Sequence, residues 1–474
     1  MILLKENKII AIRKLASSAM MLLLSACIII CAISCEDFVE VEPPASQLSA
    51  HAVFDDKTTA DAAVAAIYAR MRDNGMLSGN SLSITVKMAA YADELDFFGS
   101  GGNSTAPFFN TTLLPVNNEI NNWWKQAYNQ VYMCNAAIEG ISASTAIPQP
   151  DKDRLLGEAY FARGVLHFYL ANLFGDVPYV TITDFQQNAV ISKLPVTAIY
   201  ANVEADLLTA SDYLPEEYKD ATRSRPNKYA AMAILSRVYL YWERWAEASD
   251  AASFVLNNET LYTWTADLGT VFLKDSPTTV WQFVPPLEGR NTPEGGAFIF
   301  FAGPPTEIAL DDNLVEAFDP ADIRKSTWIK ALTNGTSTWH HPFKYKEKNP
   351  TATSLEFSIQ LRTAELYLIR SEARARQGEL VNALEDLNRI RNTAGLPDTV
   401  AQTQEDILEA ILQERRFELF TEGGHRFFDL KRAGRLDDVL GTAKPGWDTT
   451  DRLLPLPETE LVLNPNLLPQ NPGY

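Results

Sequence analysis

Cysteine is scarce in this 474-residue chain, and its distribution excludes a disulfide framework in the body of the protein. Cys27, Cys31 and Cys35 all lie near the N-terminus, and Cys134 is the one cysteine beyond them. A single thiol can form neither an intrachain disulfide nor a paired-cysteine metal site. Cys134 falls on a helical pattern, so we expect it to act as a small buried residue.

Positive charge is also in short supply. Lysine and arginine number 41 against 60 aspartates and glutamates, which gives a net charge of −19. Such an acidic surface repels phosphate backbones and anionic lipid, so we exclude nucleic acid as a partner and electrostatic binding to a membrane. Hydrophobic residues make up 46% of the chain, enough for a large core and too many for a disordered protein.

Recognisable catalytic motifs are missing. The sequence has no phosphate-binding loop, no nucleophile elbow and no zincin histidine pair. Only five histidines occur, and the adjacent His340 and His341 would point to opposite sides of an extended segment. We therefore predict no metal, no cofactor and no catalytic residue.

Two charged clusters have both a catalytic and a structural interpretation. Asp93, Glu94 and Asp96 could supply the paired carboxylates of a glycosidase. We favour a solvated or loop-capping role for them, with ligand or cation contact as the next alternative. The charged residues between Glu414 and Arg432 could form an active site, but we favour a hydrogen-bonded network that joins the last helices.

The N-terminus has the plan of a secretion signal. Four basic residues precede an uncharged stretch, 15–34, that ends in Ala32-Ile33-Ser34-Cys35. Small residues before a cysteine are typical of lipoprotein cleavage, so 1–34 is predicted to be a signal peptide and Cys35 the lipidated residue. Cys27 is the alternative. Residues 35–49 form an acidic, proline-containing tether between the lipid anchor in the membrane and the body.

Helical periodicity dominates the body. It predicts an N-terminal helical part at 50–256 and a C-terminal helical part at 359–474, with some helices in close-set pairs spaced like those of a tetratricopeptide. Ser236, Tyr239, Ala248 and Ala252 have the spacing of one such pair, and a second pair turns at Gly378. Predicted helices cover 60–71, 123–138, 154–174, 198–214, 228–241, 246–256, 361–377, 380–392 and 404–420.

The segment 257–358 interrupts this pattern. It is loop-rich, with minor β structure predicted at Thr279–Val284 and Phe298–Phe301, and loops of this length are usually functional surfaces. Its aromatic side chains offer flat faces on which sugar rings can stack, although packing beneath its own loop is the favoured role for any single ring. The candidate ligand-binding residues are Phe97, Phe98, Trp264, Phe300, Trp328, Trp339, His340 and Tyr345.

Several distinctive motifs occur in order along the chain. Two of them are Glu414-Arg-Arg-Phe-Glu-Leu419 and Glu422-Gly-Gly-His-Arg-Phe-Phe-Asp-Leu-Lys-Arg432, and the others lie at 35–44, 157–164, 173–178, 362–373, 387–392 and 464–474. Together they resemble the SusD/RagB family of nutrient-binding lipoproteins of the Bacteroidota, although the double glycine at 423–424 departs from many relatives. The resemblance implies an all-α scaffold of four tetratricopeptide-like pairs that the part at 359–474 closes, a structural role for 414–432, a cell-surface position on the outer membrane and a TonB-dependent SusC-like transporter as partner.

The function predicted from these features is capture of a glycan or an oligopeptide for a transporter, without catalysis. Two other classes compete with it. A tetratricopeptide adaptor would recognise proteins through its helices, and its binding would survive loss of the loop region. A secreted glycoside hydrolase would release sugar ends from its substrate.

Overall fold

The computed structural model of the chain describes residues 12–21, 53–444 and 446–474. The predicted lipidation site Cys35, its alternative Cys27 and the tether 35–49 therefore lie outside the described residues. The chain divides into two units, 1–52 and 53–474, and the second unit is the body of the protein. No helix in the part that the structure describes has the length and apolar character needed to cross a membrane.

The helices lie close to where periodicity predicted them. The helix α10, Lys228–Tyr241, has the expected bounds. Helix α6 extends further at both ends, and its start is fixed by Asn117, which caps it by accepting from the amides of Glu119 and Ile120. The other long helices are α3 (Lys57–Asp73), α6 (Asn118–Ala143), α7 (Gln149–Phe174), α9 (Val196–Tyr213), α11 (Trp245–Leu256), α15 (Thr363–Arg376), α16 (Leu380–Thr393) and α17 (Gln404–Leu419).

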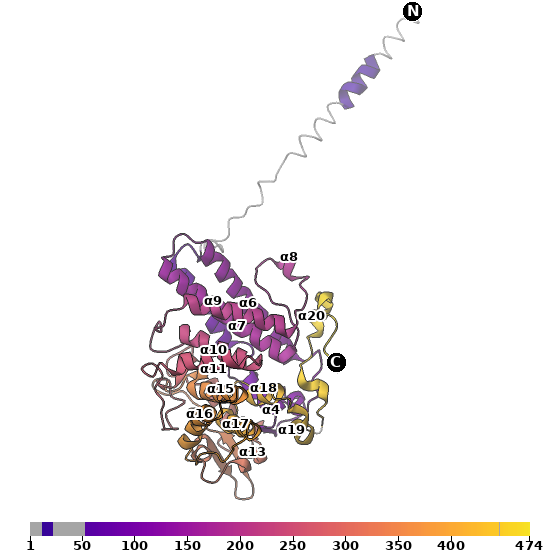
Figure 1. Cartoon of the computed structure of the whole chain (residues 1–474). Coiled ribbons are helices and arrows are strands. Elements are labelled where there is room, and N and C mark those ends of the chain that lie inside the picture. The colour runs from indigo at the N-terminus through magenta and orange to yellow at the C-terminus, as the bar shows by residue number, and fades with distance from the viewer. Residues whose placement is uncertain (1–11, 22–52, 445) are drawn as a thin grey trace, which may run out of the picture. The chain divides into compact units, whose positions relative to one another are not determined.

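Helix pairs with short turns form the scaffold, as the spacing of small residues predicted. Ser236 on α10 and Ala248 and Ala252 on α11 are fully buried where these two helices meet. Gly378 has a φ of +82° between α15 and α16, a conformation that glycine adopts without strain. Because α11 also packs against α15, helices from both sides of the loop-rich segment share one core (Figure 1).

Short helices and strands complete the body. Among the described residues the strands form three antiparallel pairs, β1 with β3, β2 with β6 and β4 with β5. Their bounds are β1 Leu95–Phe97, β2 Thr279–Phe283, β3 Ile308–Leu310, β4 Ile329–Thr333, β5 Thr338–Pro342 and β6 Ser358–Arg362. The short helices are α4 (Ile84–Tyr91), α5 (Ala106–Phe109), α8 (Phe185–Asn188), α12 (Pro293–Phe298), α13 (Asp312–Ala317), α14 (Ile323–Trp328), α18 (His425–Arg432), α19 (Leu436–Ala443) and α20 (Glu458–Leu463).

One predicted strand is wrong. Thr279–Val284 is confirmed as β2, but Phe298 is the last residue of α12 and 299–301 form no strand. Thr292 accepts a hydrogen bond from the amide of Gly295, and Pro293 occupies the first helical position, so this segment begins as α12.

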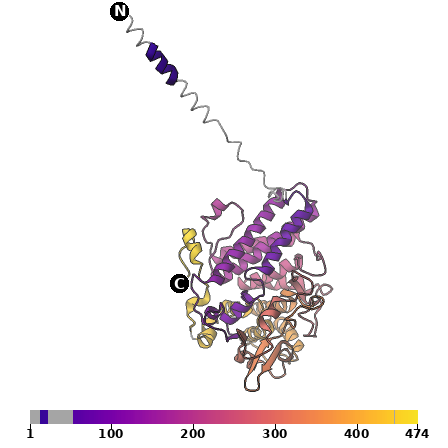
Figure 2. The same ribbon diagram turned by 180° about the vertical axis from the view of Figure 1, so that it is seen from behind.

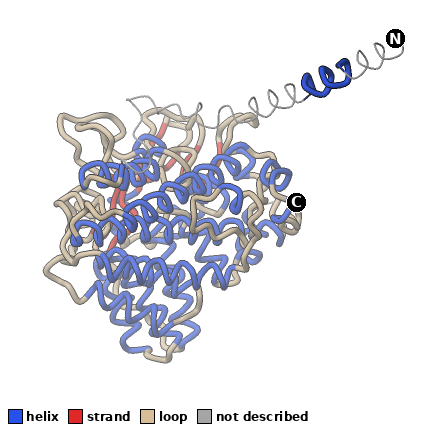
Figure 3. Tube along the Cα trace, turned by 90° about the horizontal axis from the view of Figure 1, so that it is seen from above, coloured by secondary structure: helices blue, strands red, loops and turns tan. Residues whose placement is uncertain are grey.

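The all-α class with a minor β component is confirmed, and the strands and long loops gather on one side of the helices (Figure 3). A second, smaller hydrophobic cluster lies beneath them and includes Phe272, Phe318 and Trp328. The loops therefore rest on a packed base of their own, which holds the surface above them in place.

Candidate ligand-binding face

Five side chains from three separate segments make up the strongest candidate site, which we call the loop face: Phe98, Phe300, Phe301, Trp339 and His340. The pairing of β1 with β3 holds the first of them, and the amide of Phe98 donates to the carbonyl of Glu307 at 2.7 Å. β3 in turn contacts β5, which carries Trp339 and His340. Figure 2 shows the β4–β5 hairpin projecting at the lower end of the molecule.

Trp339 is positioned by a close approach to Gly303. A methyl group at Gly303 would come within 2.2 Å of Cζ3 of the indole, so only glycine leaves room for the ring there. The ring itself stays half-buried. The hairpin thus presents an indole whose place is fixed by the loop that follows α12.

Two phenylalanines of the loop face are open to solvent. Phe98 is 41% exposed and Phe301 is 65% exposed, whereas Phe300 is half-buried and packs edge-on against His341 at 4.9 Å. Phe97, the neighbour of Phe98, turns inward and stacks obliquely on Phe109 at 6.0 Å. The exposed rings of Phe98, directly after β1, and Phe301, shortly after α12, are suited to stacking on an apolar ligand face.

A polar cleft of about 380 Å³ adjoins these rings, and its lining includes Asn80, Ser81, Phe300, Glu307 and Lys348. The carboxylate of Glu307 accepts from the hydroxyl of Thr105 at 2.6 Å, which in turn accepts from the ammonium of the buried Lys87. Burial lowers the pKa of Lys87 to about 8. The cleft therefore combines hydrogen-bonding groups with an aromatic wall, the composition of a small-molecule site.

Acidic groups lie at the other edge of the loop face. Nδ1 of His340 is 3.7 Å from a carboxylate oxygen of Asp312. Burial, and then the nearby charges of Asp311 and Asp312, raise the pKa of Asp96 to about 6. In the described part of the chain no three His, Cys, Asp or Glu side chains converge in a way that could hold a metal ion.

Trp328 and Tyr345 are not on the loop face, which corrects the prediction that they contact a ligand. Trp328 is 0% exposed, and its indole N–H donates to the carbonyl of Leu268 at 3.0 Å. The hydroxyl of the buried Tyr345 accepts from the amide of Ile359 at 2.8 Å. Both rings belong to the hydrophobic cluster beneath the strands and loops. Burial there is favourable because large aromatic rings remove much apolar surface from water.

Trp264 also lies apart from the loop face. Its indole N–H donates to the hydroxyl of Thr393 at the end of α16, and its ring packs edge-on against Tyr367 at 5.1 Å. The predicted residues thus separate into a loop face, two buried supports and one tryptophan beside α16. Phe301 belongs to the loop face but was not among the predicted contacts; the glycine and prolines that follow it were the available signal of an exposed turn.

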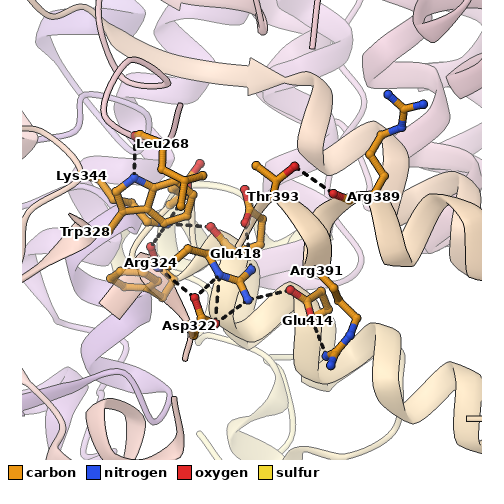
Figure 4. Close-up of polar contacts among 12 residues, drawn as sticks. Leu268, Asp322, Arg324, Trp328, Lys344, Arg389, Arg391, Thr393, Glu414 and Glu418 are labelled. Carbon is orange, nitrogen blue, oxygen red and sulfur yellow. Dashed lines mark hydrogen bonds and ion pairs between the residues drawn. The ribbon is translucent and has the colours of Figure 1, made fainter. Parts of the chain in front are cut away.

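The cluster at 414–432 is a buried ion network, as predicted. Nη2 of Arg324 lies 2.7 Å from oxygens of both Asp322 and Glu414, and Nη1 lies 3.0 Å from Glu418 (Figure 4). Arg362 bonds the other oxygen of Glu418 at 2.6 Å. With opposite charges interleaved this closely, the cluster holds α14, β6 and α17 together.

Of the acidic residues near β1, predicted to be solvated or loop-capping, Asp93 is buried in an ion pair and Glu94 caps a loop by accepting from the amide of Thr421 at 3.2 Å. Asp93 is buried, and its two oxygens accept from Nε and Nη2 of Arg426 at 2.6 and 2.8 Å. The neighbouring Glu94 is buried as well, and burial, followed by the charge of Asp93, raises its pKa to about 8. The side chains of Asp93 and Glu94 therefore tie the chain before β1 to Arg426 and Thr421.

Two family models and several known proteins are similar in sequence to this chain. Residues 37–240 match a family model described as "Starch-binding associating with outer membrane", and residues 320–474 match the model of the SusD family. SusD-like protein P2 of Formosa agariphila is 28% identical, over 93% of this chain and 97% of its own length. SusD-like protein P25 of the same organism is 23% identical over the same shares.

Solved structures have the same fold. A SusD superfamily protein from Parabacteroides distasonis superposes with a TM-score of 0.76 at 22% identity, over 90% of this chain and all of that one. A structure described as a laminarin binding SusD-like protein gives a TM-score of 0.74 at 21% identity, over 89% of this chain and all of that one. Two family models matching different stretches in order, and relatives aligned over almost the full length, lead to one conclusion: the chain belongs to the SusD/RagB family.

Proposed function

We propose that this protein captures a glycan on the loop face and hands it to a SusC-like TonB-dependent transporter, without chemically changing it. The observation that carries the proposal is the loop face, where two exposed phenyl rings and a fixed indole lie on neighbouring segments and Phe300 lines a polar cleft. Sugar rings have apolar C–H faces that stack on such side chains, and their hydroxyls need hydrogen-bonding partners beside them. One structural neighbour is described as laminarin-binding and one matching family model as starch-binding, which supports a glycan over an oligopeptide.

Affinity electrophoresis in gels containing laminarin or starch tests this proposal. We expect the wild type to be retarded by at least one of these glucans and the variants Phe98→Ala and Trp339→Ala to migrate faster. Tyr213→Ala is the matched control, because Tyr213 is a comparably exposed ring on α9 that stacks on Tyr160. Retardation unchanged in both loop-face variants would reject the site.

The absence of catalysis in this proposal is tested on the same glucans. We expect prolonged incubation with the purified protein to release no reducing ends. Release that persists through purification and is lost in Asp96→Asn would support the hydrolase alternative, because Asp96 is the half-buried carboxyl group nearest to the loop face in sequence.

A separate apolar surface is the candidate binding site for a protein partner. An apolar groove of about 570 Å³ lies between α6, α8 and α20, and Tyr132, Phe185 and Leu463 line it. Phe185 and Leu463 are each 75% exposed, and exposed apolar patches commonly mark protein interfaces. Figure 1 shows α8 and α20 beside each other on the upper part of the molecule, away from the β4–β5 hairpin. A transporter held there would leave the loop face open to the glycan.

Co-purification with a co-expressed SusC-like transporter tests that partner. We expect Phe185→Asp combined with Leu463→Asp to abolish co-purification while laminarin or starch retardation stays unchanged. Co-purification that survives both charges would place the transporter elsewhere. An adaptor function would instead be indicated if protein partners bound this groove and no glucan retarded the wild type.

Anchorage through a lipid on Cys35 completes the proposal. The small residues before Cys35 and the match to a family associated with the outer membrane support it. Metabolic labelling with a fatty acid in an expressing bacterium tests it: we expect Cys35→Ala to remove the label and Cys27→Ala to retain it. The reverse pattern would make Cys27 the lipidated residue.

A further inference from the structure

A wide groove on the solvent side of α16 is separate from the loop face. It holds about 720 Å³, within the range of roughly 300–1,000 Å³ that ligand sites occupy. The residues that give it chemical character are Trp264, Glu385, Asn388, Arg389, Asn392 and Asp398. They come from α16, from the loop that follows α16 and from the segment after α11, so the packing of these elements creates the groove.

The indole in this groove is held rigidly. Its N–H donates to Oγ1 of Thr393 at 3.0 Å, and the Thr393 hydroxyl donates to the carbonyl of Arg389 one turn earlier at 2.9 Å. Tyr367 supports the ring edge-on from the core side. A half-buried indole with its polar atom already bonded has only its apolar carbon surface to offer a ligand.

The polar side chains of the groove are held by hydrogen bonds but keep some donors and acceptors without a partner among the described residues. The side-chain oxygen of Asn388 accepts from the amide of Thr399 at 2.9 Å, and the Asn392 amide donates to Asp398 at 3.1 Å. These bonds fix the loop after α16 while leaving the Asn388 NH₂ and the Asn392 oxygen without a partner among the described residues.

Arg389 is the second unused group. Its guanidinium lies 4.9 Å from the centre of the Tyr367 ring and forms no ion pair with any residue that the structure describes. Figure 4 shows it directed away from the buried network, in contrast to Arg324 and Arg391. The chain has more carboxylates than cationic side chains, yet the N–H groups of Arg389 bond none of those that the structure describes. They are therefore available to donate hydrogen bonds to a ligand.

We infer that the α16 groove is a second glycan-binding site, specific for a neutral glucan chain. This inference rests on the proposed glycan function and adds a site to it. An indole surface with planar amide, guanidinium and carboxylate groups at its edge matches a sugar, whose face is apolar and whose rim both donates and accepts. Two carboxylates against one guanidinium leave the groove with a net charge of −1, which disfavours acidic polysaccharides.

A second site changes how a long polymer is held. Two weak sites that engage one chain together raise the apparent affinity without any new contact at either site. Short oligosaccharides cannot bridge two sites and gain nothing from this effect. The α16 groove would therefore retain polymer at the surface while the loop face selects what is passed on.

Calorimetry with laminarihexaose and maltohexaose tests the inference on the whole mature protein. We expect two sites per chain in the wild type, and one of the two weakened in each of Trp264→Ala and Trp339→Ala. Losing one stacking ring worth about 0.5–1.5 kcal/mol weakens its site roughly 2- to 12-fold. Trp264→Phe should recover most of the affinity because it keeps a stacking surface, and Arg389→Ala should weaken the same site because it removes an N–H donor. Phe254→Ala is the control, an exposed ring on α11 outside the groove.

The outcomes separate this inference from the proposed function. One site in the wild type, weakened in Trp339→Ala and unaffected by Trp264→Ala, overturns the second site and leaves the loop face standing. Binding weakened only in Trp264→Ala supports the groove and rejects the loop face. Binding of neither hexaose overturns both, and tighter binding of a polyuronate than of either hexaose at the groove overturns its neutral-glucan specificity.

Discussion

Replacing Arg324 with methionine should strongly destabilise the protein. The guanidinium is 0% exposed and is shared by Asp322, Glu414 and Glu418. Methionine fills a similar volume but supplies no charge, so the buried carboxylates lose their common cation.

The size of the effect depends on the partners that each carboxylate keeps. Glu414 retains Arg391 at 3.2 Å and Glu418 retains Arg362 at 2.6 Å, but Asp322 has no other cationic partner among the described residues. Removing one member of a buried ion pair costs about 3–5 kcal/mol, since the remaining charge stays buried without compensation. We expect a loss in this range, from Asp322 above all.

Urea denaturation at pH 7 and at pH 4 measures this loss. The difference between wild type and variant should shrink at pH 4, because an unpaired buried carboxylate is neutralised by protonation. Arg435→Met is the matched control: Arg435 pairs with Glu409 at 2.7 Å on the surface, and an exposed pair of this kind is worth less than about 1 kcal/mol. The reasoning is refuted if Arg324→Met is no more destabilising than Arg435→Met at pH 7.

Three further predictions concern single residues. Gly303→Ala should weaken laminarin or starch binding roughly 2- to 12-fold with little change in thermal stability, because the added methyl displaces the Trp339 ring; unchanged affinity in gel retardation would contradict this. The raised pKa of Glu94 means that the folded state holds a proton which the unfolded state releases above about pH 4.5, so stability should fall as pH rises from about 4.5 to about 8. Glu94→Gln should flatten that fall in urea titrations, and an unaltered slope would exclude Glu94 as its source. Cys134 is fully buried and burial raises the pKa of its thiol, so a thiol reagent should label it in urea but not in buffer; rapid labelling of the native protein would show that its helix opens.

The helical scaffold could be predicted because its signal is local. An apolar face repeated over several turns fixes a helix whatever surrounds it, and α10 was predicted to the residue for this reason. The run Phe298–Phe301 was too short for such a pattern. Its structure depends on the N-cap residue Thr292 and on Pro293 at the first helical position, and the sequence alone places both residues in a loop.

The candidate site could be predicted only in part because burial is decided by distant segments. Trp328 and Trp339 look alike in sequence, yet one is enclosed by the cluster around Phe272 and the other rests on Gly303 at the surface. The same limit applies to Asp93, which is buried by an arginine 333 residues further along the chain. The local composition of the sequence was enough to predict which region carries the aromatic rings. Which of these rings remain accessible to solvent depends on tertiary packing, which the local sequence does not show.

Hydrogen exchange at short labelling times, with and without saturating laminarin or starch, tests the central claim most directly. If the loop face holds the glycan, protection should appear at 97–101, 299–304 and 338–341, on three segments that only the fold brings together. A glucan that binds tightly while these three segments exchange as fast as in the free protein would contradict the account.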